Sequence, residues 1–220
     1  MDSKETIMPV LFPPHPESKI SDHRLEEYEK SGRWLAQRKF NGTHVVIHVS
    51  PERKVSILTR HGTPPKLFSL KKTHIDQILS LDIEEGKEYW FDGELLDHKT
   101  KSGDYKGKIV LFDVLHAGQY LIKKLNQEGR LDLLKKICRN PDSREPGRGI
   151  ALKVTDDMWM AETWDKDFKG HFEEFLDMDE IEGLILRKAD SFIDNFGQKK
   201  YDVAWILRCR KPHSGGNYNF

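Results

Sequence analysis

Cysteine is scarce in this sequence, and long apolar runs are missing. Its 220 residues include two cysteines, Cys138 and Cys209, far apart in the chain. This excludes a disulfide framework and a cysteine-rich zinc site, and it is typical of a reducing, cytoplasmic setting. No apolar run is long enough to cross a membrane, and the N-terminal residues lack the basic start and apolar stretch of a secretory signal. We expect an intracellular protein that does not contact membranes.

The sequence also lacks an excess of charge of either sign, because 36 lysines and arginines balance 36 aspartates and glutamates. A neutral chain does not coat nucleic acid by bulk charge, although a local basic track can still engage phosphates. Such a track runs from Lys199 to Lys211, while Glu173 to Glu182 is acidic. Composition alone leaves open whether these segments bind a partner or are two solvated surfaces.

Hydrophobic periodicity and turn residues predict many strands and a few helices. The expected strands are 34–39, 43–49, 55–59, 88–96, 108–115, 150–154, 183–187 and 203–210. The expected helices are a short one capped by Ser21-Asp22, then 71–81, 120–138 with an interruption near Gly129, and 165–178. Pro9 to Pro16 is expected to be an extended arm. The pattern predicts an α+β fold with antiparallel β-sheets flanked by helices.

Chemistry is first suggested by Lys39-Phe40-Asn41-Gly42. A lysine at the end of an apolar-flanked strand, just before a glycine turn, can point into a pocket. Its amine is a nucleophile when it is neutral, and nearby cations or partial burial favour that state. Taken alone, the motif is more typical of a solvated lysine at the end of a hairpin.

Further motifs follow Lys39 in a fixed order. They are Thr59-Arg60-His61-Gly62, Asp92-Gly93-Glu94-Leu95-Leu96, Val110-Leu111-Phe112-Asp113-Val114, Glu182-Gly183-Leu184-Ile185-Leu186-Arg187 and Trp205 to Lys211. The ordered set resembles the covalent-lysine nucleotidyltransferase superfamily, which contains DNA ligases, RNA ligases and mRNA capping enzymes. Each motif is common by chance, but the ordered set is specific, and it spans 35–211.

The resemblance implies an ATP-grasp-like nucleotidyltransferase (adenylation) domain at 34–212, after an N-terminal arm and short helix at 1–33 and before a flexible tail at 213–220. Members of the superfamily usually continue into an OB-fold domain, and the largest departure from their pattern is that we expect no OB-fold domain here. It implies ATP as substrate, Mg²⁺ or alternatively Mn²⁺ as cofactor, and a lysine–AMP intermediate. The partner would be nicked double-stranded DNA or an RNA/DNA hybrid, bound by a monomer. A role in DNA repair or replication, in a virus or phage, would suit a small ligase.

Residue roles follow from the resemblance, position by position. Lys39 would be the nucleophile, and Glu182 would bind the metal or position its water. Arg208 and Arg210 would meet the α-phosphate and the leaving group from one face of a strand. The nucleotide would be held by four further residues: Gln37 at the adenine edge, Arg60 at the ribose or the end phosphate, Glu94 at a ribose hydroxyl, and Phe112 stacked on the base. For Phe112 the alternative is plain core packing.

Several positions depart from the superfamily pattern. Asn41 stands where aspartate is usual, Gln37 where glutamate is frequent, and His44 where DNA ligases place arginine. The last motif is normally Lys-x-Lys. Here Arg208-x-Arg210 fits best, although a shift by one residue would pair Cys209 with Lys211.

These features leave four functions open. A DNA ligase is favoured by FDGELL and EGLILR, whereas Asn41, Thr43 and His44 suggest an RNA ligase or a ligase for mixed strands. A capping guanylyltransferase would use GTP instead of ATP. An inactive nucleic-acid-binding module is the fourth, but it would have no chemical reason to keep all three of Lys39, Glu94 and Glu182. Without an OB-fold, the chain is either one domain of a longer protein or a minimal ligase.

Overall fold

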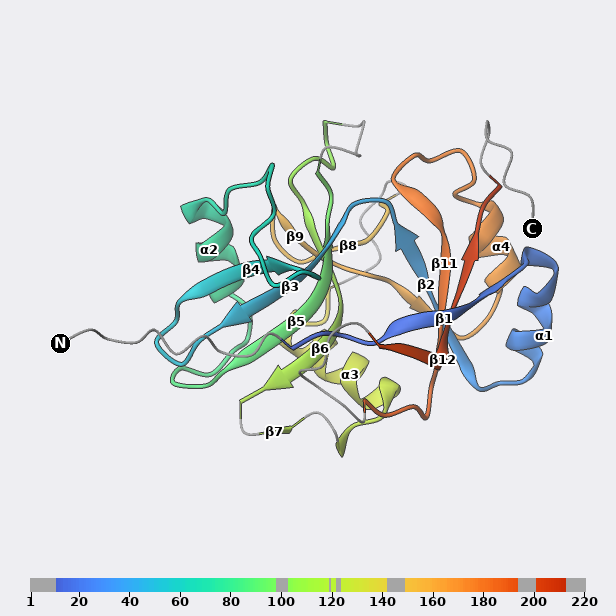
Figure 1. Ribbon diagram of the computed structural model, residues 1–220, viewed down its shortest axis with the longest axis horizontal. Coiled ribbons are helices and arrows are strands. Elements are labelled where there is room, and N and C mark those ends of the chain that lie inside the picture. Colours follow the sequence, from blue (N-terminus) through green and yellow to red (C-terminus); the bar gives the residue numbers. More distant parts are fainter. Residues whose placement is uncertain are drawn as a thin grey trace.

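The computed structural model describes residues 11–97, 103–118, 120–121, 124–141, 149–193 and 201–212. Within these residues, the strands form two sheets that lie side by side, with helices on their outer faces (Figure 1). This is the predicted α+β class. The described residues contain no separate OB-fold domain. No described helix is both long and apolar enough to span a membrane.

The first sheet has five strands, and its central strands come from the middle and the end of the chain. Its order is β1 (His15–Ile20), β12 (Asp202–Arg210), β11 (Ile181–Lys188), β2 (Trp34–Phe40) and β10 (Thr163–Trp164). Strand β1 runs parallel to β12, whereas the other pairs are antiparallel. The 3-10 helix η1 (Asp22–Arg24) leads into α1 (Leu25–Lys30), which packs with α4 (Phe168–Glu173) against one face of this sheet.

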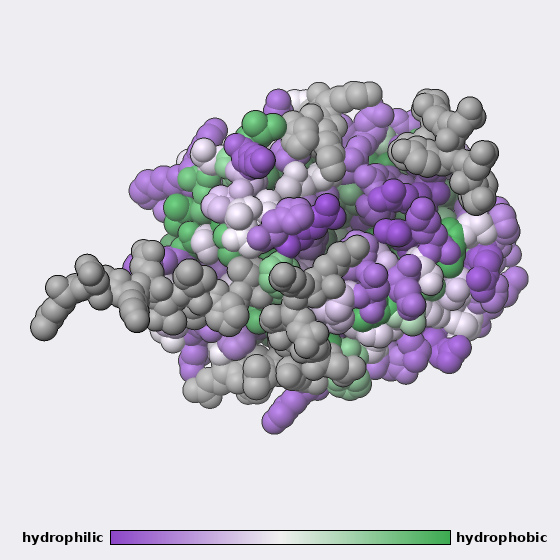
Figure 2. Space-filling view, viewed as in Figure 1, coloured by the Kyte–Doolittle hydropathy of each residue, from purple (hydrophilic) through white to green (hydrophobic). Residues whose placement is uncertain are grey.

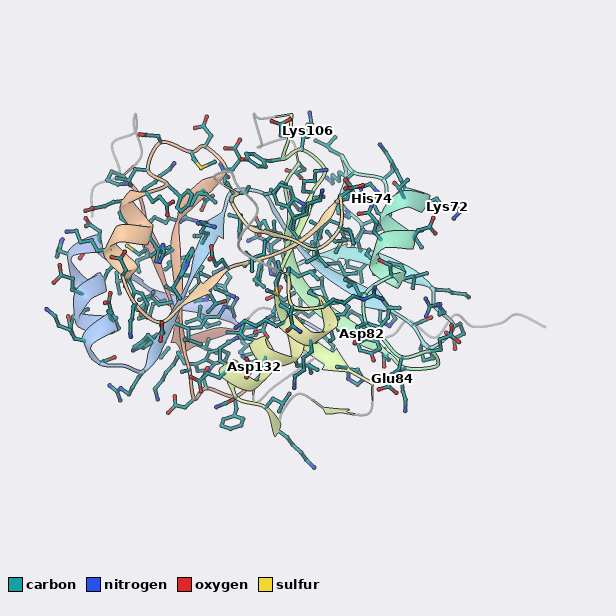
Figure 3. The ribbon with its side chains drawn as sticks, turned by 180° about the vertical axis from the view of Figure 1, so that it is seen from behind. Lys72, His74, Asp82, Glu84, Lys106 and Asp132 are labelled. Atoms are coloured by element: carbon teal, nitrogen blue, oxygen red, sulfur yellow. The ribbon has the colours of Figure 1, made fainter. Side chains whose placement is uncertain are left out.

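The second sheet has seven strands, six of them on its main path. Its order is β4 (Val55–Thr59), β3 (Thr43–Val49), β5 (Tyr89–Leu95), β6 (Ile109–Ala117), β9 (Met158–Met160) and β8 (Leu152–Lys153), with β7 (Tyr120–Leu121) paired to β6. Helices α2 (Lys72–Leu79) and α3 (Gln127–Ile137) cover its outer face. Seen from behind, Lys72 on α2 and Asp132 on α3 point away from this sheet (Figure 3).

Alternation along the strands decides which side chains reach the site. In the first sheet, Leu207 and Cys209 pack under α1 and α4 with Leu184 and Leu186. Their neighbours in sequence therefore point to the opposite face, toward the second sheet. Two small apolar clusters join the sheets at either side, one around Phe40, Val110 and Ile181, and the other around Val46, Trp90 and Ile193. A polar region is left between them.

Most predicted strands are confirmed, but several predictions need correction. Residues 120–138 are not one helix interrupted at Gly129: they begin with β7, and α3 runs through Gly129, whose N–H is capped by the Asn126 side chain. From His15 onward the proline-rich arm is strand β1, paired with β12. The sequence also gives no sign of β9 and β10, because strands of two or three residues are too short to show alternation.

Helix limits also differ. Helix α4 covers Phe168–Glu173 rather than 165–178, and 150–154 contributes only Leu152–Lys153 as strand β8. Ser21 occupies the predicted cap position, but its hydroxyl lies 2.8 Å from Nε2 of His23 instead of capping the helix. The predicted tail at 213–220 and the basic residues Lys199 and Lys200 lie outside the described residues.

Candidate active site

A cleft of about 670 Å³ lies between the two sheets. Strands β2, β11 and β12 of the first sheet and β3, β5 and β6 of the second contribute its lining. All eight residues that the sequence analysis selects line this cleft: Gln37, Lys39, Arg60, Glu94, Phe112, Glu182, Arg208 and Arg210. In the space-filling view, hydrophilic side chains gather on this face over the junction of the sheets (Figure 2). Residues up to 173 positions apart in the sequence are thus brought into one site (Gln37 and Arg210).

Lys39 and Glu182 form the centre of the site. The Lys39 Nζ donates to Oε2 of Glu182 over 2.5 Å, and Nη2 of Arg210 lies 3.3 Å from the same oxygen. The pairing of β2 with β11, which sets Lys39 opposite Gly183, brings these side chains together. Both are partly buried, with exposed side-chain fractions of 19% and 24%. The lysine amine therefore faces the cleft and is held in place by a carboxylate.

Two glycines let the backbone adopt this geometry. A Cβ at Gly42 would lie 2.3 Å from the carbonyl oxygen of Leu95, so β3 and β5 approach too closely there for any side chain. The Gly42 N–H donates to Oε1 of Glu94 over 3.0 Å, which fixes this carboxylate beside the turn that follows Lys39. Gly183 has a φ of +138°, and a Cβ there would meet the Cys209 carbonyl oxygen. The glycines next to Lys39 and Glu182 thus serve close packing.

The structure places the side chains of the last motif in different surroundings. Arg208 and Arg210 line the cleft, whereas Cys209 is fully buried under the helices, where burial raises the pKa of its thiol to about 12. Lys211 points away, and its Nζ donates to the carbonyl groups of Leu176 and Met178. The Arg208-x-Arg210 frame is the one that places two cations in the site.

Arg208 is partly buried, and one of its donors lacks a partner among the described residues. Burial, together with the nearby charge of Arg210, lowers the pKa of its guanidinium. Its Nε is buried and has no hydrogen-bond partner among the described residues. A buried donor without a partner is costly, and an anionic ligand in the cleft would satisfy it.

Gln37 and Phe112 lie together at the inner end of the cleft. The Gln37 Nε2 donates to the Phe112 carbonyl oxygen over 3.3 Å and to Oγ1 of Thr163 over 3.0 Å. The Phe112 ring is half-buried, with the Arg187 guanidinium 5.4 Å from its centroid and the His44 ring near-parallel at 6.0 Å. The ring therefore belongs both to the edge of an apolar cluster and to the wall of the cleft.

The structure adds cleft residues to which the sequence analysis gave no role. His44 Nε2 lies 2.7 Å from Oδ1 of buried Asp92. Burial acts to lower the pKa of His44, but the charge of Asp92 and this hydrogen bond outweigh it, so the pKa is raised above its usual value. Arg187, the last residue of EGLILR, also lines the cleft. Arg60, by contrast, is exposed, and its Nε donates to Nε2 of His61 in the loop after β4.

This two-sheet architecture is that of a nucleotidyltransferase fold. More particularly, the structure has the fold of ATP-dependent DNA ligase domains. No family model matches the sequence, and no curated protein matches it.

Three solved structures illustrate the likeness. Mycobacterial DNA ligase D, complexed with ATP and MES, is 16% identical with a TM-score of 0.59 over 90% of this chain and 60% of that one. The ligase domain of ligase D from M. tuberculosis is 15% identical with a TM-score of 0.57, over 90% and 58%. The ATP-dependent DNA ligase of bacteriophage T7, in complex with ATP, is 11% identical with a TM-score of 0.55, over 90% and 68%. The chain spans about three fifths of the two mycobacterial chains.

Proposed function

We propose that this chain is the adenylation domain of an ATP-dependent polynucleotide ligase that seals nicks in duplex nucleic acid, with DNA as the favoured substrate. The observation that carries the proposal is the ion pair of Lys39 with Glu182 beside Arg210 and Arg208 in one cleft. A reactive amine, a carboxylate and two cations are the groups that in-line attack on a phosphate requires. Support for DNA comes from the similar structures, which are those of DNA ligases.

In the first step, Lys39 Nζ attacks the α-phosphorus of ATP, an N–P bond forms, and pyrophosphate leaves. The amine must lose a proton, and Oε2 of Glu182, which already accepts a hydrogen bond from Nζ, is the group placed to take it. Arg208 and Arg210 offset the charge that builds up on the phosphate oxygens. Phe112 stacks on the base, Glu94 accepts from a ribose hydroxyl, and Arg60 at the mouth meets the ribose or the end phosphate.

The later steps reuse the same groups. The AMP moves from Lys39 to the 5′-phosphate of the nick, which restores the amine and gives a pyrophosphate-linked end. The 3′-hydroxyl then attacks that 5′-phosphate, a phosphodiester bond forms, and AMP leaves with its phosphate. Arg208 and Arg210 hold the phosphate that reacts in each step, so one pair of cations serves all three transfers.

The residues of the cleft fit a magnesium ion. Among the described residues, no cluster of three or more acidic, histidine or cysteine side chains could hold a metal by itself. Mg²⁺ does not need one, because it keeps several waters and binds through one or two carboxylates together with substrate phosphates. Glu182 would be its protein ligand, and the ion would neutralise phosphate charge during the transfer. Mn²⁺ would suit the same oxygen ligands.

The test is intact mass after incubation with Mg²⁺ and either ATP or GTP. An adduct of AMP that is absent in Lys39→Ala is the expected result, and pre-adenylated nicks in DNA, RNA and hybrid duplexes then give the strand preference. A GMP adduct would instead indicate a capping enzyme. If neither nucleotide gives an adduct and pre-adenylated nicks stay open, the enzyme proposal is wrong and a binding module remains.

A further inference from the structure

A buried polar network connects the two sheets behind the cleft. Its centre is Asp113 on β6, which is 1% exposed and lies 3.0 Å from Nε of Arg130 on α3. A second guanidinium approaches from the other sheet, with Nη1 of Arg187 on β11 3.5 Å from Oδ2 of Asp113. The Arg187 Nε then donates to Oε1 of Gln37 on β2 over 3.2 Å. A chain of charged and polar groups therefore runs from α3 to the inner wall of the cleft.

This network fixes which way the Gln37 amide points. The Phe112 carbonyl oxygen can only accept a hydrogen bond, so it must face the amide NH₂, and the Arg187 Nε can only donate, so it must face the amide oxygen. Both N–H groups of Gln37 are used, by Phe112 and by the hydroxyl of Thr163 directly across the strand pair. Gln37 can therefore accept one more hydrogen bond, through the remaining lone pair on its oxygen.

We infer that Arg187 is a positioning residue through which the protein selects the nucleobase. It does so by holding the Gln37 oxygen as an acceptor at the edge of the base stacked on Phe112. The inference rests on the proposed function for the place of the base. An acceptor there pairs with the 6-amino group of adenine and opposes the 6-oxo group of guanine or hypoxanthine. Asp113 acts one step further back, because its carboxylate holds Arg187 in a buried position that a lone arginine would not occupy, and Arg130 fixes Asp113 in turn.

This assignment answers a question that the sequence leaves open. Glutamate offers only acceptors, so its orientation does not matter, whereas glutamine presents a donor or an acceptor according to how its amide is turned. A free glutamine would tolerate either purine. With the Arg187 Nε donating to its oxygen, Gln37 presents an acceptor to the base, as a glutamate would. The network therefore fixes the orientation of the amide, which a glutamate would not need.

The experiment measures equilibrium binding of ATP and ITP by calorimetry in the Lys39→Ala background, so that no covalent product forms. ITP carries a 6-oxo group and no 2-amino group, which isolates the 6-position. We expect ATP to bind at least about 100-fold more tightly than ITP. In Lys39→Ala/Arg187→Met this preference should fall to below about tenfold, because the amide is free to turn. Arg33→Met, which removes an exposed arginine, should keep the preference.

A double-mutant cycle separates positioning from general damage. If Arg187 acts through Gln37, then Gln37→Met alone removes the preference and adding Arg187→Met changes it no further. Equal weakening of ATP and ITP by Arg187→Met would overturn the inference, since a purely structural role predicts that result. Arg187→Lys serves if the methionine variant does not fold, because lysine keeps the charge beside Asp113 without the guanidinium Nε.

The result is distinct from that of the adenylation test. An ATP preference that depends on Arg187, in a protein that forms no AMP adduct, would refute the lysine–AMP proposal and leave base selection standing. An adduct in the wild type combined with an ATP preference unchanged by Arg187→Met would support the lysine–AMP proposal and refute the role of Arg187 in base selection. Failure of both nucleotides to bind, together with no AMP adduct in the wild type, would refute both.

Discussion

The Lys39 Nζ and the Glu182 Oε2 lie 2.5 Å apart, and the oxygen is shared with Arg210 at 3.3 Å. The carboxylate therefore lies between two basic side chains, one of which is the proposed nucleophile. In the proposed reaction this arrangement would hold the Lys39 amine in position before ATP arrives, with Glu182 as the group placed to take its proton.

Glu182→Gln should slow formation of the lysine–AMP adduct by about 100-fold or more, because the amide keeps the size of the side chain but is a poor proton acceptor. The rate is measured in a single turnover with saturating ATP and Mg²⁺. Glu173→Gln, at an exposed position on α4, is the matched control and should react at the wild-type rate. An unchanged rate in Glu182→Gln would show that this carboxylate takes no part in the proton transfer.

Arg210→Ala and Lys211→Ala differ by one position but should behave very differently. Arg210 lines the cleft, whereas Lys211 binds backbone carbonyls near the end of α4. We expect Arg210→Ala to lower the rate of adduct formation by about 100-fold, as for other residues that stabilise charge in a transition state, and Lys211→Ala to leave it within a few-fold. The opposite order would favour the Cys209/Lys211 frame.

Gly183→Ala should destabilise the fold more than an ordinary turn substitution. The added Cβ would lie 2.0 Å from the Cys209 carbonyl oxygen, at a residue whose φ of +138° already disfavours a side chain. Together, strain and overpacking should lower the free energy of unfolding by about 3 kcal/mol. Gly86→Ala is the control, because it also has positive φ but open space around it, and it should cost about 1 kcal/mol. Urea unfolding measures both, and equal losses would argue against close packing at Gly183.

His44 should make stability depend on pH. Its pKa is raised in the folded state by Asp92, despite burial, so its contribution is fully present below the unfolded pKa and is lost as the pH rises through the folded pKa. The stability lost in His44→Gln should therefore be greater near pH 6 than near pH 9. Urea unfolding at both values measures this difference, with His23→Gln, at an exposed site, as the control. A loss that is the same at both values would contradict the raised pKa.

The sequence predicts those parts of the molecule that local patterns determine. Long alternating segments such as Thr43–Val49 are found at their observed limits, and the motif residues meet in one cleft. Strand order cannot be obtained in this way, since nothing in the chain near Lys39 says that β11 lies beside it. The frame around Cys209 depends on which face of β12 the helices cover, and only the packing shows this.

The buried position of Arg187 cannot be predicted from the sequence for a related reason. An arginine at the end of an apolar strand usually reaches solvent, and burial is tolerated here because Asp113 and Gln37 approach from two other strands. Those partners are 74 and 150 residues away in the sequence (187 − 113 and 187 − 37). A single sequence holds no signal for such a pairing, because each partner is common in its own segment.

The parallel pairing of β1 with β12 has a consequence for how the molecule acquires its structure. His15 and Asp202, 187 positions apart, are the first residues of these two strands. During synthesis the ribosome releases β2 and β3 long before β12, so Arg208 and Arg210 can join the cleft only after nearly all the described chain has emerged. We therefore expect the first sheet to be completed late and slowly, as contacts between distant segments require. Nascent chains that stop short of residue 202 would carry Lys39 without the cations that face it.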